Sequence, residues 1–217
     1  MSMSIIILGP SGSGKGTLAE WIIREFGFKH FSSGAIFREH IANKTPLGIE
    51  VKALIEGGVW VCDELTMQMV FESMRKVDTS KGFILDGVPR TMKQVEILEQ
   101  EFKIDLVIEL DIDDKAVIKR LSGRWVCPKC EASYNVRFGA VDQCAKCQSA
   151  LYQREDDKEE AITRRLAQYR APQKEITQFY RTRGVLETVD IGEDTPAEVY
   201  AKIRPIIEKV LKAKKLV

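Results

Sequence analysis

The stretch Gly9-Pro10-Ser11-Gly12-Ser13-Gly14-Lys15-Gly16-Thr17 follows directly on an apolar run at residues 4–8. A strand, a glycine-rich turn and a helix in that order form a cradle for phosphates, because the turn directs backbone N–H groups inward and the helix dipole points at the same place. The stretch matches the phosphate-loop pattern G-x-x-x-x-G-K-[ST], except that Gly16 stands where a Ser or Thr would bind magnesium. A glycine-rich turn without function is the alternative, but the flanking strand and helix signals disfavour it. The sequence therefore predicts a nucleotide-binding loop.

Charge and hydropathy limit the classes of partner. The chain has 217 residues, with 33 Lys and Arg against 32 Asp and Glu, so no general field attracts nucleic acid or an acidic membrane. The sequence has no apolar run of about 18 residues, and the phosphate loop follows Met1 too closely for a signal peptide. We therefore expect a cytoplasmic protein with a local anion site and with no membrane or nucleic-acid partner.

Five short apolar segments, rich in Ile, Val and Phe, are typical of strands buried on both faces. They cover residues 4–8, 28–31, 82–85, 105–111 and 186–191. Amphipathic segments predict helices near residues 15–25, 34–43, 46–56, 64–77, 91–101, 115–121, 158–182 and 195–216. Strands that alternate with helices imply a parallel sheet covered on both faces. The sequence thus predicts an α/β fold of three layers, α/β/α, around a five-stranded parallel sheet.

The alternation of strands and helices breaks at two places. Three helices separate the second and third strands, and residues 123–157 contain no long periodic segment. A stretch of that length inside a compact enzyme usually has a function or a small fold of its own. We expect both segments to be insertions at the carboxyl edge of the sheet, where such folds bind ligands. The predicted division is a core of residues 1–31, 61–122 and 158–217, with insertions 32–60 and 123–157.

Four of the five cysteines, Cys127, Cys130, Cys144 and Cys147, form a C-x2-C, x13, C-x2-C array. Two such turns complete a tetrahedral zinc site, and four thiolates leave no position for a reacting water, so the predicted zinc is structural. Residues 132–139 between the pairs are expected to form a hairpin. Four unrelated thiols are the alternative. A nucleic-acid-binding ribbon is disfavoured because residues 123–158 hold six basic and five acidic side chains.

One acid and several arginines complete the candidate site. Asp86 ends an apolar strand, where phosphate-loop enzymes place an acid that serves magnesium, although an ordinary turn Asp is the alternative. Phosphoryl transfer needs positive charge around the phosphoryl oxygens, and the planar fork of arginine supplies it. Each candidate arginine alone is more typical of a solvated surface, but the set clusters around loops at one sheet edge. The candidates are Arg38, Arg90, Arg120, Arg124, Arg154 and Arg165. The two histidines, His30 and His40, are expected to be structural or solvated.

These motifs resemble those of the adenylate kinases, in the long-lid, zinc-containing form common in bacteria. Residues 32–38 (SSGAIFR) are similar to the family's I-S-T-G-D-x-x-R. Residues 82–91 (GFILDGVPRT) are similar to G-F-[IL]-L-D-G-[FY]-P-R-T, with Gln94 at the family's spacing. Residues 122–124 (SGR) open the lid segment and residues 151–157 (LYQREDD) close it. The resemblance runs from the first strand to the last helix.

The resemblance implies reversible, magnesium-dependent phosphoryl transfer from ATP to AMP, giving two ADP, in a monomer. It makes insertion 32–60 the monophosphate-binding domain and insertion 123–157 a small zinc-ribbon-like lid. The implied ATP-binding residues are Gly12, Ser13, Gly14, Lys15, Gly16, Thr17, Arg120 and Arg124. The implied AMP-binding residues are Ser33, Arg38, Arg90, Gln94, Arg154 and Arg165. The implied catalytic residues are Lys15, Asp86, Arg90, Arg124, Arg154 and Arg165.

Two other functions stay open on the sequence. The nearest is a kinase for UMP, CMP or GMP, or one with GTP as donor. Gln94 and the long lid favour AMP, whereas residues 192–196 depart from the family's G-T-x-P pattern and leave the donor base open. The other is a nucleotide-dependent switch that binds nucleic acid through the zinc ribbon, for which the charge balance gives no support.

Overall fold

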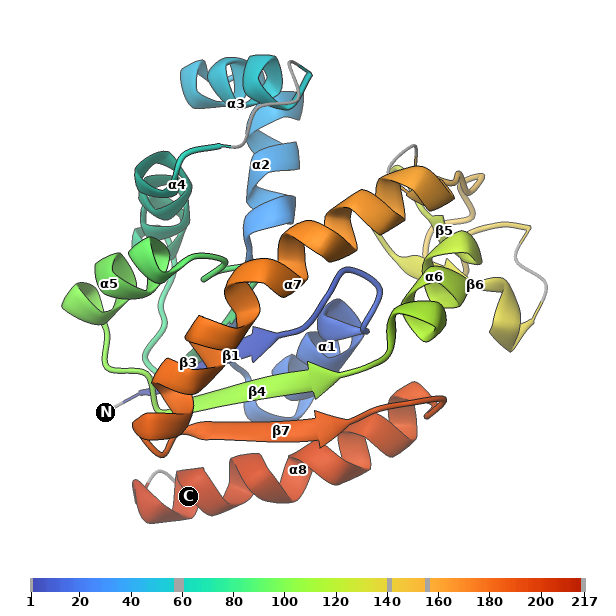
Figure 1. Cartoon of the computed structure of the whole chain (residues 1–217). Helices are drawn as coiled ribbons and strands as arrows, with labels where there is room; N and C mark the ends of the chain where they lie inside the picture. Colours follow the sequence, from blue (N-terminus) through green and yellow to red (C-terminus); the bar gives the residue numbers. More distant parts are fainter. Residues whose placement is uncertain (1, 57–60, 140–141, 155–156, 216–217) are drawn as a thin grey trace.

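A five-stranded parallel sheet forms the centre of the computed structural model, which describes residues 2–56, 61–139, 142–154 and 157–215 (Figure 1). The strands are β1 (Met3–Leu8), β2 (Lys29–Ser32), β3 (Gly82–Asp86), β4 (Leu106–Asp111) and β7 (Leu186–Asp190). Their order is β2-β3-β1-β4-β7, and every pair is parallel. The predicted α/β fold is confirmed, with each strand within two residues of its expected position.

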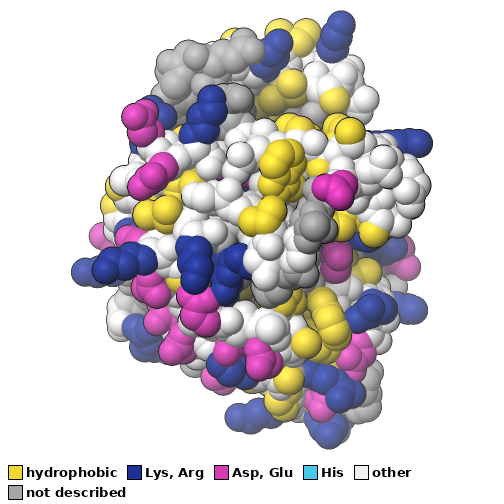
Figure 2. Space-filling view, turned by 90° about the vertical axis from the view of Figure 1, so that its right-hand side faces the viewer, with side chains coloured by type: hydrophobic (Ala, Val, Ile, Leu, Met, Phe, Trp, Pro, Cys, Tyr) yellow, Lys and Arg dark blue, Asp and Glu magenta, His cyan; other side chains and the backbone are white. Residues whose placement is uncertain are grey.

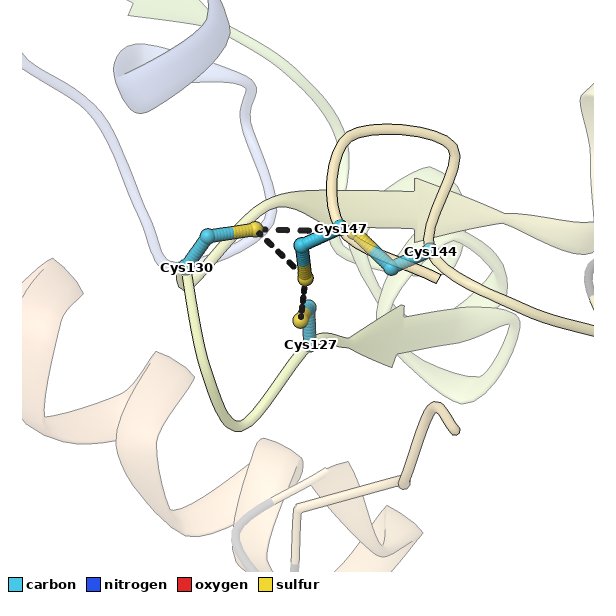
Figure 3. A group of neighbouring side chains, drawn as sticks. All are labelled: Cys127, Cys130, Cys144 and Cys147. Carbon is cyan, nitrogen blue, oxygen red and sulfur yellow. Dashed lines mark hydrogen bonds between the residues drawn. The ribbon is translucent and has the colours of Figure 1, made fainter. Parts of the chain in front are cut away.

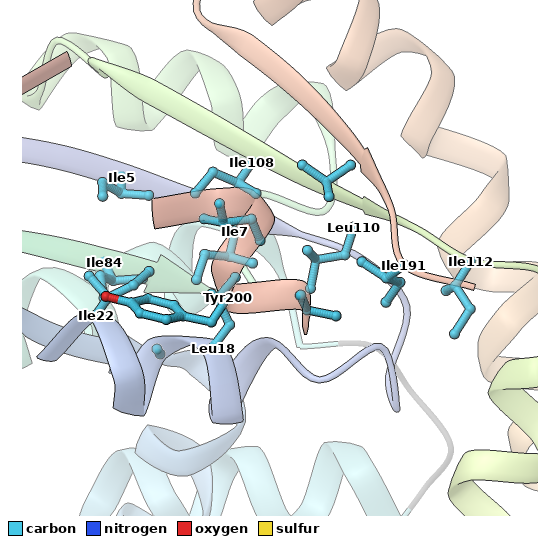
Figure 4. Close-up of a cluster of buried hydrophobic side chains, with 14 of the residues drawn as sticks. Ile5, Ile7, Leu18, Ile22, Ile84, Ile108, Leu110, Ile112, Ile191 and Tyr200 are labelled. Atoms are coloured by element: carbon cyan, nitrogen blue, oxygen red, sulfur yellow. The ribbon is translucent and has the colours of Figure 1, made fainter. Parts of the chain in front are cut away.

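Helices cover both faces of the sheet because β1 is buried at every position and is apolar from Ile5 to Leu8. Ile5 and Ile7 pack in one cluster of buried residues, on the face covered by α1 (Lys15–Phe26) and α8 (Pro196–Ala213). Figure 4 shows these two isoleucines together with side chains of both helices. Ile6 and Leu8 belong to the cluster on the opposite face. Alternate residues of a strand point to opposite faces, so a continuous apolar strand needs two helical layers.

The second helical layer comprises α4 (Asp63–Arg75), α5 (Met92–Glu101) and α7 (Glu159–Thr182). A further helix, α6 (Asp114–Ser122), contributes to the core on the side of α1 and α8. Side-chain caps set several helix starts: Thr91 accepts from the N–H of Gln94, and Thr195 forms a reciprocal capping box with Glu198. Such caps satisfy N–H groups that have no partner inside the helix.

Two helices of the first insertion project from the sheet edge, between β2 and α4 (Figure 1). They are α2 (Ser33–Ala42) and α3 (Pro46–Glu56). The two helices approach closely at Gly48, where an added Cβ would lie 2.0 Å from the carbonyl oxygen of His40. A residue without a side chain is therefore required at this crossing.

The second insertion is a small β structure around the cysteines. It contains β5 (Arg124–Val126), β6 (Ser133–Asn135) and the short 3-10 helix η1 (Val136–Phe138). The expectation that residues 132–139 form a hairpin by themselves is wrong. Instead β6 pairs antiparallel with β5, and the first cysteine turn is the connection between them. After β6 the chain forms η1, where the side chain of Asn135 accepts a hydrogen bond from the N–H of Arg137.

Candidate functional site

The phosphate loop joins β1 to α1 and leaves its N–H groups open. Gly12 and Gly14 have φ values of 86° and 94°, in the left-handed region that favours glycine. Gly14 is the N-cap of α1 and supplies no side-chain cap, so the first-turn N–H groups, including those of Gly16 and Thr17, keep their capacity to bind an anion. Ser13, which is part of the loop, is buried together with its hydroxyl. The loop is therefore shaped as an anion cradle.

The ammonium group of Lys15 folds back over this loop. Its Nζ donates to the carbonyl oxygens of Gly9 and Pro10 at 2.8 and 2.9 Å. Burial, opposed by the charge of Asp86 and assisted by nearby arginines, lowers the pKa of Lys15 to about 8. A charge held in partly desolvated surroundings gains much from an incoming phosphate.

Asp86 ends β3 beside the loop, because the parallel register places it opposite Ile7 of β1. Its carboxylate lies 3.9 Å from Lys15 Nζ and 3.5 Å from His30 Nε2. Burial opposes ionisation of Asp86, but Lys15 and His30 outweigh it and hold its pKa below the usual value. The side chain is therefore a carboxylate at neutral pH, which suits an outer ligand of a hydrated cation.

A cleft of about 190 Å³ opens between the phosphate loop, the segment after β3 and α7. Arg90, which follows β3, and Arg165, on α7, both line it. Arg165 Nη2 donates to the hydroxyl of Ser11 at 2.7 Å, and Arg90 Nε donates to the carbonyl oxygen of Gly87 at 2.8 Å. Desolvation in the cleft, and then the charge of Arg165, lower the pKa of Arg90. Two guanidinium groups that repel each other across a cleft are stabilised by a polyanion between them.

Arg124, at the start of the second insertion, is held by a fully buried carboxylate. Its Nε and Nη2 donate to Asp157 at 2.8 and 2.5 Å, and the side chain of Asp157 has no exposed surface. Arg165 Nη1 lies 4.0 Å from the same carboxylate. Within the described part of the chain, Arg154 Nε is buried without a hydrogen-bond partner. Asp157 thus links two of the predicted arginines, and Arg154 keeps a donor for a ligand.

The predicted acceptor residues lie on α2 and after β3. Ser33, which is buried, donates from its hydroxyl to the carbonyl oxygen of Gly87 at 3.1 Å. Gln94 accepts from the N–H of Arg90 and donates to Asp63, at 2.7 and 2.8 Å. Its amide nitrogen has a second proton and its oxygen a second lone pair, so Gln94 can still offer one donor and one acceptor to a base.

Arg38 on α2 reaches across to the second insertion. Its Nε and Nη2 donate to the two carboxylate oxygens of Glu131 at 2.8 and 3.3 Å. This contact joins the two insertions.

Arg120 lies on the other side of the phosphate loop. Its guanidinium donates to the carbonyl oxygens of Gly192, Asp194 and Ser13 at 2.8, 3.4 and 3.5 Å. Main-chain groups of the phosphate loop and of the segment after β7 therefore hold Arg120 at the position predicted to lie beside a nucleotide base.

The four cysteines meet in the second insertion, with their sulfur atoms directed at one another (Figure 3). The Sγ–Sγ distances include 3.4 Å for Cys127–Cys147, 3.5 Å for Cys130–Cys144 and 3.7 Å for Cys130–Cys147. A tetrahedron with metal–sulfur bonds of about 2.3 Å has sulfur–sulfur edges of about 3.8 Å. The donor set therefore fits a four-thiolate zinc site.

Asp157 and Glu131 are the site residues whose partners sequence reasoning did not identify. Asp157 ends the predicted closing motif of the lid, which pointed to its neighbourhood but not to Arg124 as its partner. Glu131 follows a cysteine turn and carried no signal. His30, which was expected to be structural or solvated, lies beside Asp86.

The surface agrees with the balanced composition. On the face seen in Figure 2, Lys and Arg side chains alternate with Asp and Glu. Among the described residues, no helix has the length and apolar character needed to cross a membrane.

Comparison with known proteins gives a consistent result. A family model described as adenylate kinase matches residues 7–185. An adenylate kinase of Lactobacillus johnsonii is 41% identical over 218 aligned residues, which cover 95% of this chain and 99% of that protein. An adenylate kinase of Finegoldia magna is 43% identical, with 87% and 91% covered, and one of Treponema denticola is 42% identical, with 96% of each covered. Because the match extends far beyond the phosphate loop and includes both insertions, the chain belongs to the adenylate kinase family.

Proposed function

We propose that the chain transfers the γ-phosphoryl group of ATP reversibly to AMP, giving two ADP. The observation that carries this proposal is the convergence of positive groups at one cleft. Lys15, Arg90 and Arg165 line the same cleft, and the carboxylate of Asp157 joins Arg165 to Arg124. These groups come from the phosphate loop, the segment after β3, α7 and the lid, so they surround a common space. Such an arrangement suits two phosphate chains that meet end to end.

ATP would occupy the side of the cleft formed by the phosphate loop. The N–H groups from Gly12 to Thr17 and the ammonium of Lys15 would bind its phosphates, while Arg120 would lie beside its base. Magnesium would arrive with ATP and neutralise charge on its phosphates. Asp86 would orient it through water, since this carboxylate is ionised and lies next to the loop.

AMP would occupy the side formed by α2 and the segment after β3. Arg38 and Arg90 would bind its phosphate, with Ser33 lining the same wall. Gln94 would read the adenine with its remaining donor and acceptor. The acceptor insertion would then be residues 32–60.

Catalysis would rest on position and charge, without a covalent enzyme intermediate. Arg124, Arg154 and Arg165 would contact the transferring phosphoryl group, whose oxygens carry the charge in the transition state. Arg124 and Arg154 belong to the lid of residues 123–157, so closure of the lid would deliver them and exclude water at the same step.

The four cysteines would hold one structural zinc. The described residues between 123 and 157 bury a small apolar cluster around Cys127, Ala132 and Cys144, so metal binding would supply much of the folding energy of the lid. We further propose that the protein is a monomer, in line with the family resemblance, and that it acts in the cytoplasm.

A coupled assay of ADP formation from ATP with AMP, CMP, UMP or GMP tests the function. We expect turnover with AMP to exceed turnover with the other three at least tenfold. Preference for another monophosphate would identify a different member of the nucleoside monophosphate kinases. Slow ATP hydrolysis that is stimulated by nucleic acid, with no dependence on a monophosphate, would refute the proposal.

A further inference from the structure

The contact between Arg38 and Glu131 uses the edge of the arginine that a phosphate needs. Nε and Nη2 both donate to the Glu131 carboxylate, and this paired edge is the one that binds carboxylate or phosphate with two parallel bonds. The remaining terminal nitrogen, Nη1, is directed at α2 itself, since a Cβ built on Gly34 would lie 3.3 Å from it. A ligand phosphate and Glu131 therefore cannot both take the paired edge.

The positive charges around the Glu131 carboxylate are also those that a bound phosphate would meet. Both oxygens of this carboxylate accept hydrogen bonds from Arg38, and the positive charge of Arg154 acts on the same carboxylate. Both arginines are predicted AMP-binding residues. The carboxylate thus lies where the positive groups of α2 and of the lid meet.

The backbone at Glu131 shows that the carboxylate is not needed to form the cysteine turn. Glu131 and Gln148 each follow the second cysteine of a pair and adopt φ values of 56° and 61°. In both turns the N–H of this residue donates to the carbonyl oxygen of the first cysteine, at 3.0 and 2.8 Å. The second turn forms with a neutral glutamine at the equivalent position, so the same residue is compatible with the first.

We propose that Glu131 is an internal competitor of the AMP phosphate for Arg38, and that it thereby sets the affinity for the acceptor. This inference rests on the proposed role of Arg38 in binding AMP. AMP must displace the carboxylate from Arg38 before it gains both hydrogen bonds, and the displaced charge remains close to the phosphate. The pair is partly exposed, with 41% of the Arg38 side chain and 51% of the Glu131 side chain accessible. Its effect should therefore be on the scale of an exposed ion pair.

The substitution Glu131→Gln tests the proposal, with AMP binding measured by calorimetry in the absence of ATP. We expect the dissociation constant and the KM for AMP to fall about two- to fivefold, on the scale of exposed ion pairs, with the KM for ATP unchanged. Because solvent screens such a pair, the ratio of wild-type to variant affinity should approach one at high salt. The matched control is Asp142→Asn, which removes the same charge from an exposed lid position. It should leave AMP binding unchanged.

Arg38→Gln separates this inference from the function on which it rests. AMP binding by this variant should be at least tenfold weaker, and Glu131→Gln should add no gain in its background. If Arg38→Gln binds AMP like the wild type, the acceptor role of Arg38 is wrong. If Arg38→Gln weakens binding but Glu131→Gln leaves it equal or weaker, the competition is wrong and the acceptor role stands.

Discussion

Replacing single glycines of the phosphate loop by alanine separates two destabilising effects, backbone strain and steric overlap. The structure places them at different positions. At Gly12 the φ value is 86°, and an added Cβ would lie 2.6 Å from Leu121 Cγ and 2.9 Å from Leu121 Cδ2. At Gly14 the φ value is 94°, but no atom of the described residues lies within 4 Å of an added Cβ. At Gly16, inside the first turn of α1, φ lies outside the left-handed region and the space is again open. The three positions form a graded series.

Alanine at each position gives a different change in the free energy of unfolding. A left-handed residue with a Cβ costs about 1–2 kcal/mol, which is the expected loss for Gly14→Ala. Gly12→Ala adds an overlap with the buried Leu121, worth about 1–3 kcal/mol, for a total loss of about 2–5 kcal/mol. Gly16→Ala should be neutral or stabilising by up to about 1 kcal/mol, because alanine favours the helix.

Urea unfolding followed by circular dichroism measures these changes without a ligand. Leu121→Ala provides the internal check, since it removes the atoms that the new Cβ would meet. In that background, Gly12→Ala should cost only the backbone strain, similar to Gly14→Ala. The reasoning is refuted if Gly12→Ala and Gly14→Ala are equally stable in the wild-type background, or if Leu121→Ala does not reduce the difference.

Three further predictions concern Asp157, which binds Arg124, then Lys15, and then the cysteine cluster. Asp157→Asn should lower kcat/KM for ATP about tenfold, on the scale of a lost charge-assisted hydrogen bond; an unaltered steady-state rate would contradict it. Lys15 has a pKa of about 8 in the fold and 10.5 as its ordinary value, so the unfolded chain binds more protons between these values and stability should rise with pH there. Lys15→Met should abolish that rise in urea titrations at pH 7.5 and 10, and an identical pH dependence in both proteins would refute the assignment. Cys144→Ser should reduce the metal content from one zinc per chain to none and make residues 123–157 the first site of trypsin cleavage; full zinc retention would exclude the four-thiolate site.

The fold could be predicted from the sequence because its signals are local and strong. Continuous apolar runs such as residues 4–8 have one stable position, inside a sheet covered on both faces, and capping residues such as Thr91 and Thr195 place the helix starts. The second insertion, residues 123–157, was less predictable. Its strands have three residues each, and the pairing of β5 with β6 follows from the cysteine turn between them and not from any periodicity.

The candidate site was predictable in its residue types and less so in its pairings. Arginines after strand ends indicate where positive charge gathers, but not which carboxylate holds each one. Asp157 lies 33 positions from Arg124, and Glu131 lies 93 positions from Arg38. Only the folded arrangement of the two insertions brings such pairs together.

Arg120 binds carbonyl oxygens at residues 13, 192 and 194, and no side chain of those residues takes part. Every amino acid carries the same carbonyl group, so mutation at Asp194 leaves this acceptor in place. The loop after β7 can therefore diverge in sequence while it still anchors the guanidinium, which accounts for its departure from the G-T-x-P pattern. Selection at this edge of the nucleotide site would then act on the path of the backbone more than on the identity of the side chains.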